Sequence, residues 1–161
     1  MKARNDGKPD GKKIVASNRK ARHDYEILDV YEAGLSLVGA EVKSLRAGKA
    51  VLEGAFARSE NDELYLYNLY IAPYSHATLD LPDPKRTRKL LLRRAELKRL
   101  TSRLLGKALT VVPLELYFRH GWAKVELALA RGKRGRDRRE TLRKKDETRE
   151  LERTFKGRFK L

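Results

Sequence analysis

The residue types that perform catalysis occur in this chain, but their spacing fits no catalytic constellation. The serines lie in no recognisable nucleophile elbow, and the three histidines are scattered without an orienting pattern. Asp80 and Asp83 lie in a proline-rich loop, where they are expected to form turns and not to hold a metal ion. With no cysteine, the chain has neither a disulfide framework nor a thiolate metal site, which is compatible with a reducing cytoplasm. We therefore expect a binding protein with no cofactor, no metal ion and no enzymatic activity.

The residues suited to binding are cations. The chain carries 38 Lys and Arg against 22 Asp and Glu, a net charge of +16. Residues 1–22 contribute +6 and residues 131–161 contribute +8, whereas residues 23–130 hold only +2. Within that body, residues 85–107 contain ten basic residues against the single Glu96. A basic patch set against an acidic remainder suits a polyanion, and nucleic acid is favoured over a membrane because no amphipathic helix pairs the charges with a broad aromatic face.

A hairpin followed by a short helix is predicted to organise the rest of the chain. Residues 25–33 are rich in β-branched, aromatic and aliphatic types, Gly34 predicts a tight reversal, and residues 35–38 resume the strand. The predicted helix then opens at Glu41 and ends at Gly48.

Two cations share one face of that helix. Lys43 and Arg46 lie three residues apart, so they could contact a phosphate backbone together. A solvated charged face is the commoner interpretation of such a pair.

The later strands predict a small barrel. They are expected at residues 51–59, 64–72, 108–118 and 122–130, with turns at 61–62 and 119–121. In the last strand, Lys124 and Glu126 are expected to point outward. Six or seven strands joined by tight turns favour a closed or nearly closed barrel, so the predicted fold is mainly β with α.

A basic helix is predicted over residues 86–105, after a loop at residues 73–84. Its leucines fall on roughly one face, a break near residues 93–94 is possible, and Leu91 lies off the apolar face and is expected to be exposed. The clustering of cations here argues for a binding role, although solubility alone would also explain it.

The wording of the central block resembles a known family. The segment EAG at residues 32–34, Gly39 and the segment EVKSLRAGK at residues 41–49 closely resemble the signature of the SsrA-binding protein (small protein B) family. The resemblance continues through residues 18–21, 86–92, 124–127 and 132–133. It implies an OB-like antiparallel β-barrel with flanking helices and a basic C-terminal tail.

The resemblance also implies a function. Family members bind transfer-messenger RNA at its transfer-RNA-like region and deliver it to ribosomes stalled without a stop codon. The expected partners are therefore this RNA and the stalled ribosome, with no membrane, and a monomer when free. The residues alone leave open a generic basic barrel that binds ribosomal RNA, or a structural interaction protein.

Particular residues are implied for RNA binding. Physically, cations pair with phosphates, His23 can stack on a base, and Leu91 can pack on a base or sugar. A carboxylate repels phosphate, so Glu32 is expected to accept a hydrogen bond from a base or ribose, or to orient a neighbouring cation. The implied RNA-binding positions are Asn18, Arg19, His23, Glu32, Lys43, Arg46, Leu91 and Lys124.

The expected domain organisation is a disordered basic arm (1–17), the barrel (18–130) and a basic tail (131–161). The tail has good helix formers but almost no aliphatic anchor, so it is expected to be disordered when free and helical on the ribosome. The resemblance implies that it enters the vacant decoding centre and messenger path. Its implied ribosome-binding residues are Lys133, Arg134, Arg136, Asp137, Arg138 and Arg139.

Targeting signals are not apparent in the sequence. The N-terminus lacks the apolar segment of a secretory signal, and no later run approaches the roughly 18 apolar residues of a membrane span. We therefore expect a soluble, cytoplasmic protein.

Overall fold

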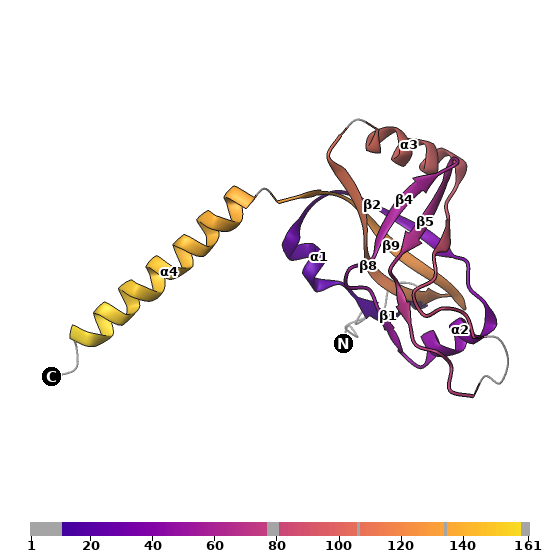
Figure 1. Ribbon diagram of the computed structural model, residues 1–161, viewed down its shortest axis with the longest axis horizontal. Coiled ribbons are helices and arrows are strands. Elements are labelled where there is room, and N and C mark those ends of the chain that lie inside the picture. Colours follow the sequence, from indigo (N-terminus) through magenta and orange to yellow (C-terminus); the bar gives the residue numbers. More distant parts are fainter. Residues whose placement is uncertain (1–10, 77–80, 106, 134, 159–161) are drawn as a thin grey trace, which may run out of the picture.

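Antiparallel strands and four helices make up the computed structural model (Figure 1). It describes residues 11–76, 81–105, 107–133 and 135–158, with the side chains of residues 143–154 in the last helix. The main sheet contains β1 (Lys13–Ser17), β2 (Tyr25–Leu35), β4 (Phe56–Glu60), β5 (Glu63–Tyr67), β7 (Arg88–Leu91), β8 (Leu109–Arg119) and β9 (Trp122–Gly132). A small second sheet pairs β3 (Ala50–Val51) with β6 (Tyr70–Ile71). The helices are α1 (Arg19–Asp24), α2 (Gly39–Arg46), α3 (Arg94–Leu104) and α4 (Gly135–Arg158).

The main sheet closes into a ring through β8. This strand pairs with β9 on one edge, while its other edge pairs with β4 near Val111 and with β1 from Glu115 to Phe118. From β4 the order runs through β5, β7 and β2 back to β9. Closure satisfies the strand edges that an open sheet would expose. The predicted mainly β, ring-closed barrel with flanking helices is confirmed.

The barrel interior is aliphatic, and its packing follows the alternation of the long strands. Val125, Leu127 and Leu129 of β9 are fully buried inside, as predicted. The opposite side of the same strand is also covered: Ala128 and Ala130 lie beneath α1 in a second cluster with Ala21, Val112 and Leu114. Part of β9 is therefore buried on both faces, which an apolar-polar alternation alone does not indicate.

The hairpin predicted at Gly34 is wrong. Gly34 lies inside the continuous strand β2, where it pairs with Leu91 of β7 and with Lys124 of β9. A Cβ added at Gly34 would stand 3.3 Å from the Cβ of Leu91. The glycine is needed for close approach of a neighbouring strand and not for a turn.

The helix predicted over residues 86–105 is divided in the structure. Its first part is the strand β7, and the helix α3 begins only at Arg94, so the break expected near residues 93–94 is confirmed. In β7, Arg88 and Leu90 are buried while Lys89 and Leu91 are exposed. A run of four residues is too short for the hydrophobic pattern to distinguish a strand from the start of an amphipathic helix.

The N-terminal segment is more ordered than predicted. Residues 13–17 form β1. This strand pairs with the part of β8 from Glu115 to Phe118, whose backbone groups on that edge have no partner in β4. Helix α1 then separates β1 from β2. Residues 1–10 lie outside the described part of the chain.

Two smaller expectations have mixed outcomes. The strand predicted at residues 51–59 is split into β3 and β4 by a turn at Gly54, whose φ of +81° favours glycine. The turns at residues 61–62 and 119–121 are confirmed, with positive φ at Asn61, Asp62 and His120.

Helix α4 extends away from the barrel (Figure 1). Its described side chains, residues 143–154, are all exposed. Even the aliphatic Leu151 is 60% exposed. The structure describes 24 helical residues here, in agreement with the predicted helix propensity, while the expected disorder of the free tail stays a prediction. No helix in the described part of the chain is long and apolar enough to cross a membrane.

Candidate nucleic-acid interface

The outward-facing side of β2, β9 and β8, which we call the outer face, gathers several of the implied binding residues. On this face Leu91, Gly34, Lys124 and Tyr117 lie in one cross-strand row over β7, β2, β9 and β8. Leu91 is 51% exposed, as predicted, and Lys124 is half-buried between its neighbours. The barrel therefore brings Leu91 and Lys124 together although 33 positions separate them in the chain.

A row of three carboxylates runs beside it. Glu32, Glu126 and Glu115 face one another across β2, β9 and β8. Like charges in register repel, so each carboxylate needs a cation. Arg119 Nη1 lies 2.5 Å from Glu32, Arg22 Nη2 lies 3.8 Å from Glu126, and Lys12 Nζ lies 2.6 Å from Glu115.

Glu32 is held at one of its two oxygens. Its Oε2 accepts hydrogen bonds from the Tyr117 hydroxyl and from Arg119. Burial, together with the hydrogen bond to Glu32, raises the pKa of Tyr117 far above its ordinary value, so this hydroxyl remains a donor. Oε1 forms no hydrogen bond with any described residue. Glu32 can thus orient Arg119 while it still presents an acceptor to a ligand.

Helix α1 supplies the next implied residues. Asn18 is only 7% exposed: it caps α1 by accepting from the Ala21 amide at 3.2 Å, and it donates to the Pro113 carbonyl at 3.1 Å. Asn18 therefore anchors α1 to β8. Arg19 and His23 are exposed on α1, and the His23 imidazole lies 3.1 Å from Asp24 through Nδ1.

Lys43 and Arg46 lie apart from this group. Both are exposed on α2, which follows the end of β2, whereas α1 precedes its start; eleven strand residues span on the order of 35 Å. Figure 1 places α1 and α2 on different sides of the barrel. The implied residues therefore form two groups. Within the α2 group, the Lys43 ammonium lies 5.4 Å from the centroid of the Tyr74 ring.

Helix α2 is anchored by a buried charge cluster. Glu41 is 3% exposed; it accepts hydrogen bonds from Arg86, from the Val38 amide at 3.1 Å and from Arg88 Nε at 2.6 Å. Arg88 is fully buried, and its guanidinium also donates to the Leu69, Arg86 and Pro84 carbonyls. Burial by itself would raise the pKa of Glu41, but the hydrogen bonds from Arg86, Val38 and Arg88 outweigh it and hold the pKa below its ordinary value.

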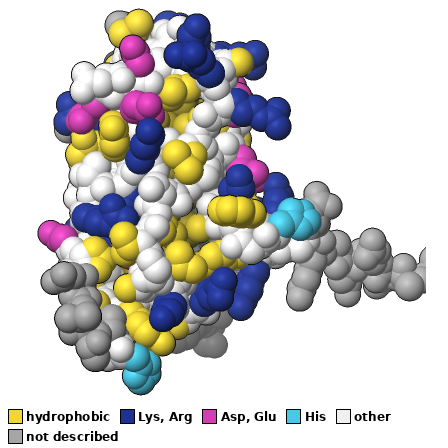
Figure 2. Space-filling view, turned by 90° about the vertical axis from the view of Figure 1, so that its right-hand side faces the viewer, with side chains coloured by type: hydrophobic (Ala, Val, Ile, Leu, Met, Phe, Trp, Pro, Cys, Tyr) yellow, Lys and Arg dark blue, Asp and Glu magenta, His cyan; other side chains and the backbone are white. Residues whose placement is uncertain are grey.

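The basic stretch at residues 85–107 divides into two kinds of cation. Four of its ten basic residues are ion-paired within the fold, namely Arg86, Arg88, Lys89 and Arg103. The other six are exposed and form no ion pair with any described residue; they are Lys85, Arg93, Arg94, Lys98, Arg99 and Lys107. Seen from one side, the barrel carries Lys and Arg side chains among exposed hydrophobic ones (Figure 2).

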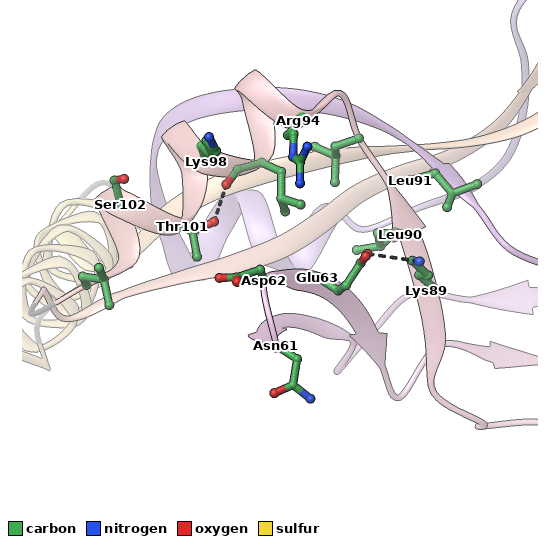
Figure 3. Close-up of a pocket in the computed structure, with 13 residues that line it drawn as sticks. Asn61, Asp62, Glu63, Lys89, Leu90, Leu91, Arg94, Lys98, Thr101 and Ser102 are labelled. Atoms are coloured by element: carbon green, nitrogen blue, oxygen red, sulfur yellow. Dashed lines mark hydrogen bonds and ion pairs between the residues drawn. The ribbon is translucent and has the colours of Figure 1, made fainter.

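A groove of about 920 Å³ runs between α3 and the strands β5 and β7 (Figure 3). Lys98 and Arg94 border it from the helix, and Leu91 lies at its end on β7. The ion pair between Glu63 and Lys89, at 3.2 Å, also lines it. These side chains show no nucleophile with a base, and the described residues contain no cluster of three His, Cys, Asp or Glu that could hold a metal ion.

The implied tail residues are placed only in part. Lys133 is exposed, and its amide donates to the Asp24 carbonyl at 3.2 Å. Arg134 and the side chains of Arg136, Asp137, Arg138 and Arg139 lie outside what the structure describes.

Three neighbours of the implied residues were missed from the sequence: Tyr117, Arg119 and Trp122. Extending the alternation that places Lys124 outward would have found Trp122, which is 74% exposed. Tyr117 and Arg119 carried no such signal, because the register shift between Pro113 and Glu115 decides which residues of β8 face Glu32.

A closed barrel whose outer face combines cations, a fixed carboxylate and exposed apolar side chains defines a small binding protein with a surface suited to nucleic acid. The family model described as "SmpB protein" matches residues 15–157. The chain belongs to the SmpB protein family.

Relatives and a solved structure agree with this assignment. An SsrA-binding protein of Salinispora tropica is 55% identical over 143 residues, covering 89% of this chain and 90% of the relative. One from Pelotomaculum thermopropionicum is 52% identical and covers 92% of this chain and 97% of the relative. A solved structure described as "tmRNA-SmpB: a journey to the center of the bacterial ribosome" has a TM-score of 0.63 and 59% identity, covering 74% of this chain and 84% of that chain.

Proposed function

We propose that this chain is a non-enzymatic RNA-binding protein that binds transfer-messenger RNA (SsrA) and delivers it to stalled ribosomes for trans-translation. Its partners are then this RNA and the bacterial ribosome, and it acts in the cytoplasm. Membership of the SmpB family and relatives named SsrA-binding proteins support the proposal. The solved structure with tmRNA and SmpB in its description supports the ribosomal partner.

The structural observation that carries the proposal is the convergence of Leu91, Lys124 and Glu32 on the outer face. Lys124 pairs with a phosphate, Leu91 packs on a sugar or base, and Glu32 accepts from a base amine or ribose hydroxyl through Oε1. The exposed Arg19 and His23 of α1 border this face and extend the contact. Asn18 acts indirectly, by holding α1 in place.

Lys43 and Arg46 contact the RNA as a separate group on α2. Since α2 follows the end of β2 and α1 precedes its start, one RNA that touches both groups must wrap around the barrel. This arrangement requires a folded RNA and not a short single strand.

The chain divides into a docking barrel, residues 13–132, and a tail that binds the ribosome. The exposed helix α4 leaves the barrel free to bind RNA. The tail cations Lys133, Arg134, Arg136, Arg138 and Arg139, with Asp137, bind ribosomal RNA in the decoding centre and messenger path.

Competition tests the specificity of this function. Labelled transfer-messenger RNA is bound to the full chain, and transfer RNA, ribosomal RNA or random RNA is added at equal mass. We expect poor displacement by each. Arg58→Ala, which removes an exposed cation from β4, serves as the control for general loss of charge and should leave the specificity unchanged. Equal displacement by ribosomal RNA would instead favour a generic basic barrel protein of the ribosome.

A further inference from the structure

We propose that Trp122 is a stacking platform for an unpaired base of the bound RNA. This inference rests on the proposed RNA-binding function and adds to it a subsite at the tip of the β8–β9 hairpin.

Trp122 is exposed to an unusual degree for its size. It is 74% exposed, more than any other large apolar side chain among the described residues. Tryptophan is enriched at binding interfaces, because its indole joins a large apolar face to a polar N–H group. Leu105, which is 73% exposed, is comparable in exposure but lies in the loop after α3.

The alternation of β9 places Trp122 on the outer face. Val125, Leu127 and Leu129 are buried inside the barrel, so Trp122 points to the same side as Lys124, two residues further along. Its cross-strand partner on β8 is Arg119, which is paired with Glu32. A base on the indole would therefore lie beside two cations that can hold its phosphates.

The hairpin makes this platform rigid. His120 and Gly121 form its two-residue turn with φ angles of +50° and +79°, the combination that matches the twist of paired strands. The ladder starts immediately at Arg119 and Trp122 and continues along both eleven-residue strands. Since the backbone beneath the indole is fixed before the RNA arrives, little conformational freedom is lost on binding.

Stacking is the chemistry that this position offers. An indole presents an extended π-face, and proteins commonly hold unpaired RNA bases on such faces. The neighbouring cations Arg119 and Lys124 favour a negatively charged RNA strand as the ligand over a protein partner with few acidic residues. The strength of base–aromatic stacking predicts that loss of the indole weakens RNA binding roughly 10- to 100-fold.

The test uses fluorescence, because Trp122 is the single tryptophan of the sequence. The full chain is titrated with transfer-messenger RNA, with free tryptophan as the control for absorption by the RNA. We expect saturable quenching at the same midpoint as RNA binding. Trp122→Ala should bind about 10- to 100-fold more weakly, Trp122→Phe should recover part of the loss, and the matched exposed variant Leu105→Ala should bind as the parent does.

Three results would overturn the stacking platform. They are unchanged fluorescence at saturating RNA, parental affinity of Trp122→Ala, or quenching that appears only when ribosomes are added. In each case a loss of binding in Lys124→Ala would leave the proposed function standing. If the parent chain does not bind the RNA at all, the proposed function itself fails, and the subsite with it. Thermal melts of Trp122→Ala should match the parent, since an exposed side chain leaves no core cavity.

Discussion

Leu91 of β7 packs beside Gly34 of β2 on the outer face, so an exposed leucine meets a strand residue without a side chain. A Cβ on Gly34 would stand 3.3 Å from the Leu91 Cβ, so a side chain at position 34 would crowd the leucine. A position that resembles a turn glycine in the sequence thus shapes the proposed RNA contact.

Gly34→Ala is expected to displace Leu91 and weaken RNA binding by roughly 3- to 10-fold, with a small change in stability. The atom that must give way is the Leu91 Cβ, so the strand β7 itself has to shift by a few tenths of an ångström. Gly132→Ala is the control, because a Cβ there meets nothing within 4 Å. RNA titrations and thermal melts on the same samples check this, and equal affinities for the two variants would contradict it.

Glu32→Ala should weaken RNA binding and also cost about 1–3 kcal/mol of unfolding free energy, because the buried Tyr117 hydroxyl loses its acceptor. The double variant Glu32→Ala/Tyr117→Phe should regain much of the stability but none of the RNA affinity. Lys124→Ala should weaken RNA binding with little effect on stability. Urea unfolding and RNA titration separate the two effects; recovery of RNA binding in the double variant would show that Glu32 acts only on the fold.

Arg88→Ala is expected to destabilise the barrel by about 3–5 kcal/mol. It leaves the buried Glu41 carboxylate and the Leu69 carbonyl without their Arg88 donor. Lys89→Ala is the matched control, because its ion pair with Glu63 is exposed and worth at most about 1 kcal/mol. Urea denaturation measures both, and similar losses in the two variants would refute the role of the buried cluster.

Glu41 should make stability depend on acid pH. Its pKa is lowered in the folded chain, so its stabilising contribution is complete above the ordinary value of 4.5 and is lost as the pH falls through the lower folded pKa. The difference in unfolding free energy between the parent chain and Glu41→Gln should therefore shrink below a pH of about 4.5. Urea titrations across the acid range measure that difference, which would stay constant if Glu41 were not charged in the fold.

Removing the tail should separate docking from rescue. Arg131 and Gly132 pair with Glu26 and Tyr25 in β2, so the chain must be cut after Gly132 to keep β9 intact. We expect this truncated chain to bind transfer-messenger RNA with nearly parental affinity. It should fail to support tagging of nascent chains on stalled ribosomes. Normal tagging by the truncated chain, or loss of RNA binding, would contradict the division between barrel and tail.

The sequence by itself determined the class of fold and the kind of ligand. Alternation in β9 placed Lys124 outward, turn residues located the loops at Asn61 and His120, and the distribution of cations favoured a polyanion. These features are local, because strand period, turn angles and charge depend on neighbouring residues.

Only the tertiary structure decided which residues meet. Gly34 became a site of close strand approach, Arg88 entered the core as the partner of Glu41, and Asn18 became an anchor for α1. Each of these roles depends on strand register and ring closure between segments far apart in the chain, which local patterns do not contain. The same register sets Trp122 and Arg119 beside Lys124 and Glu32, and so brings four separate positions together in the proposed binding surface.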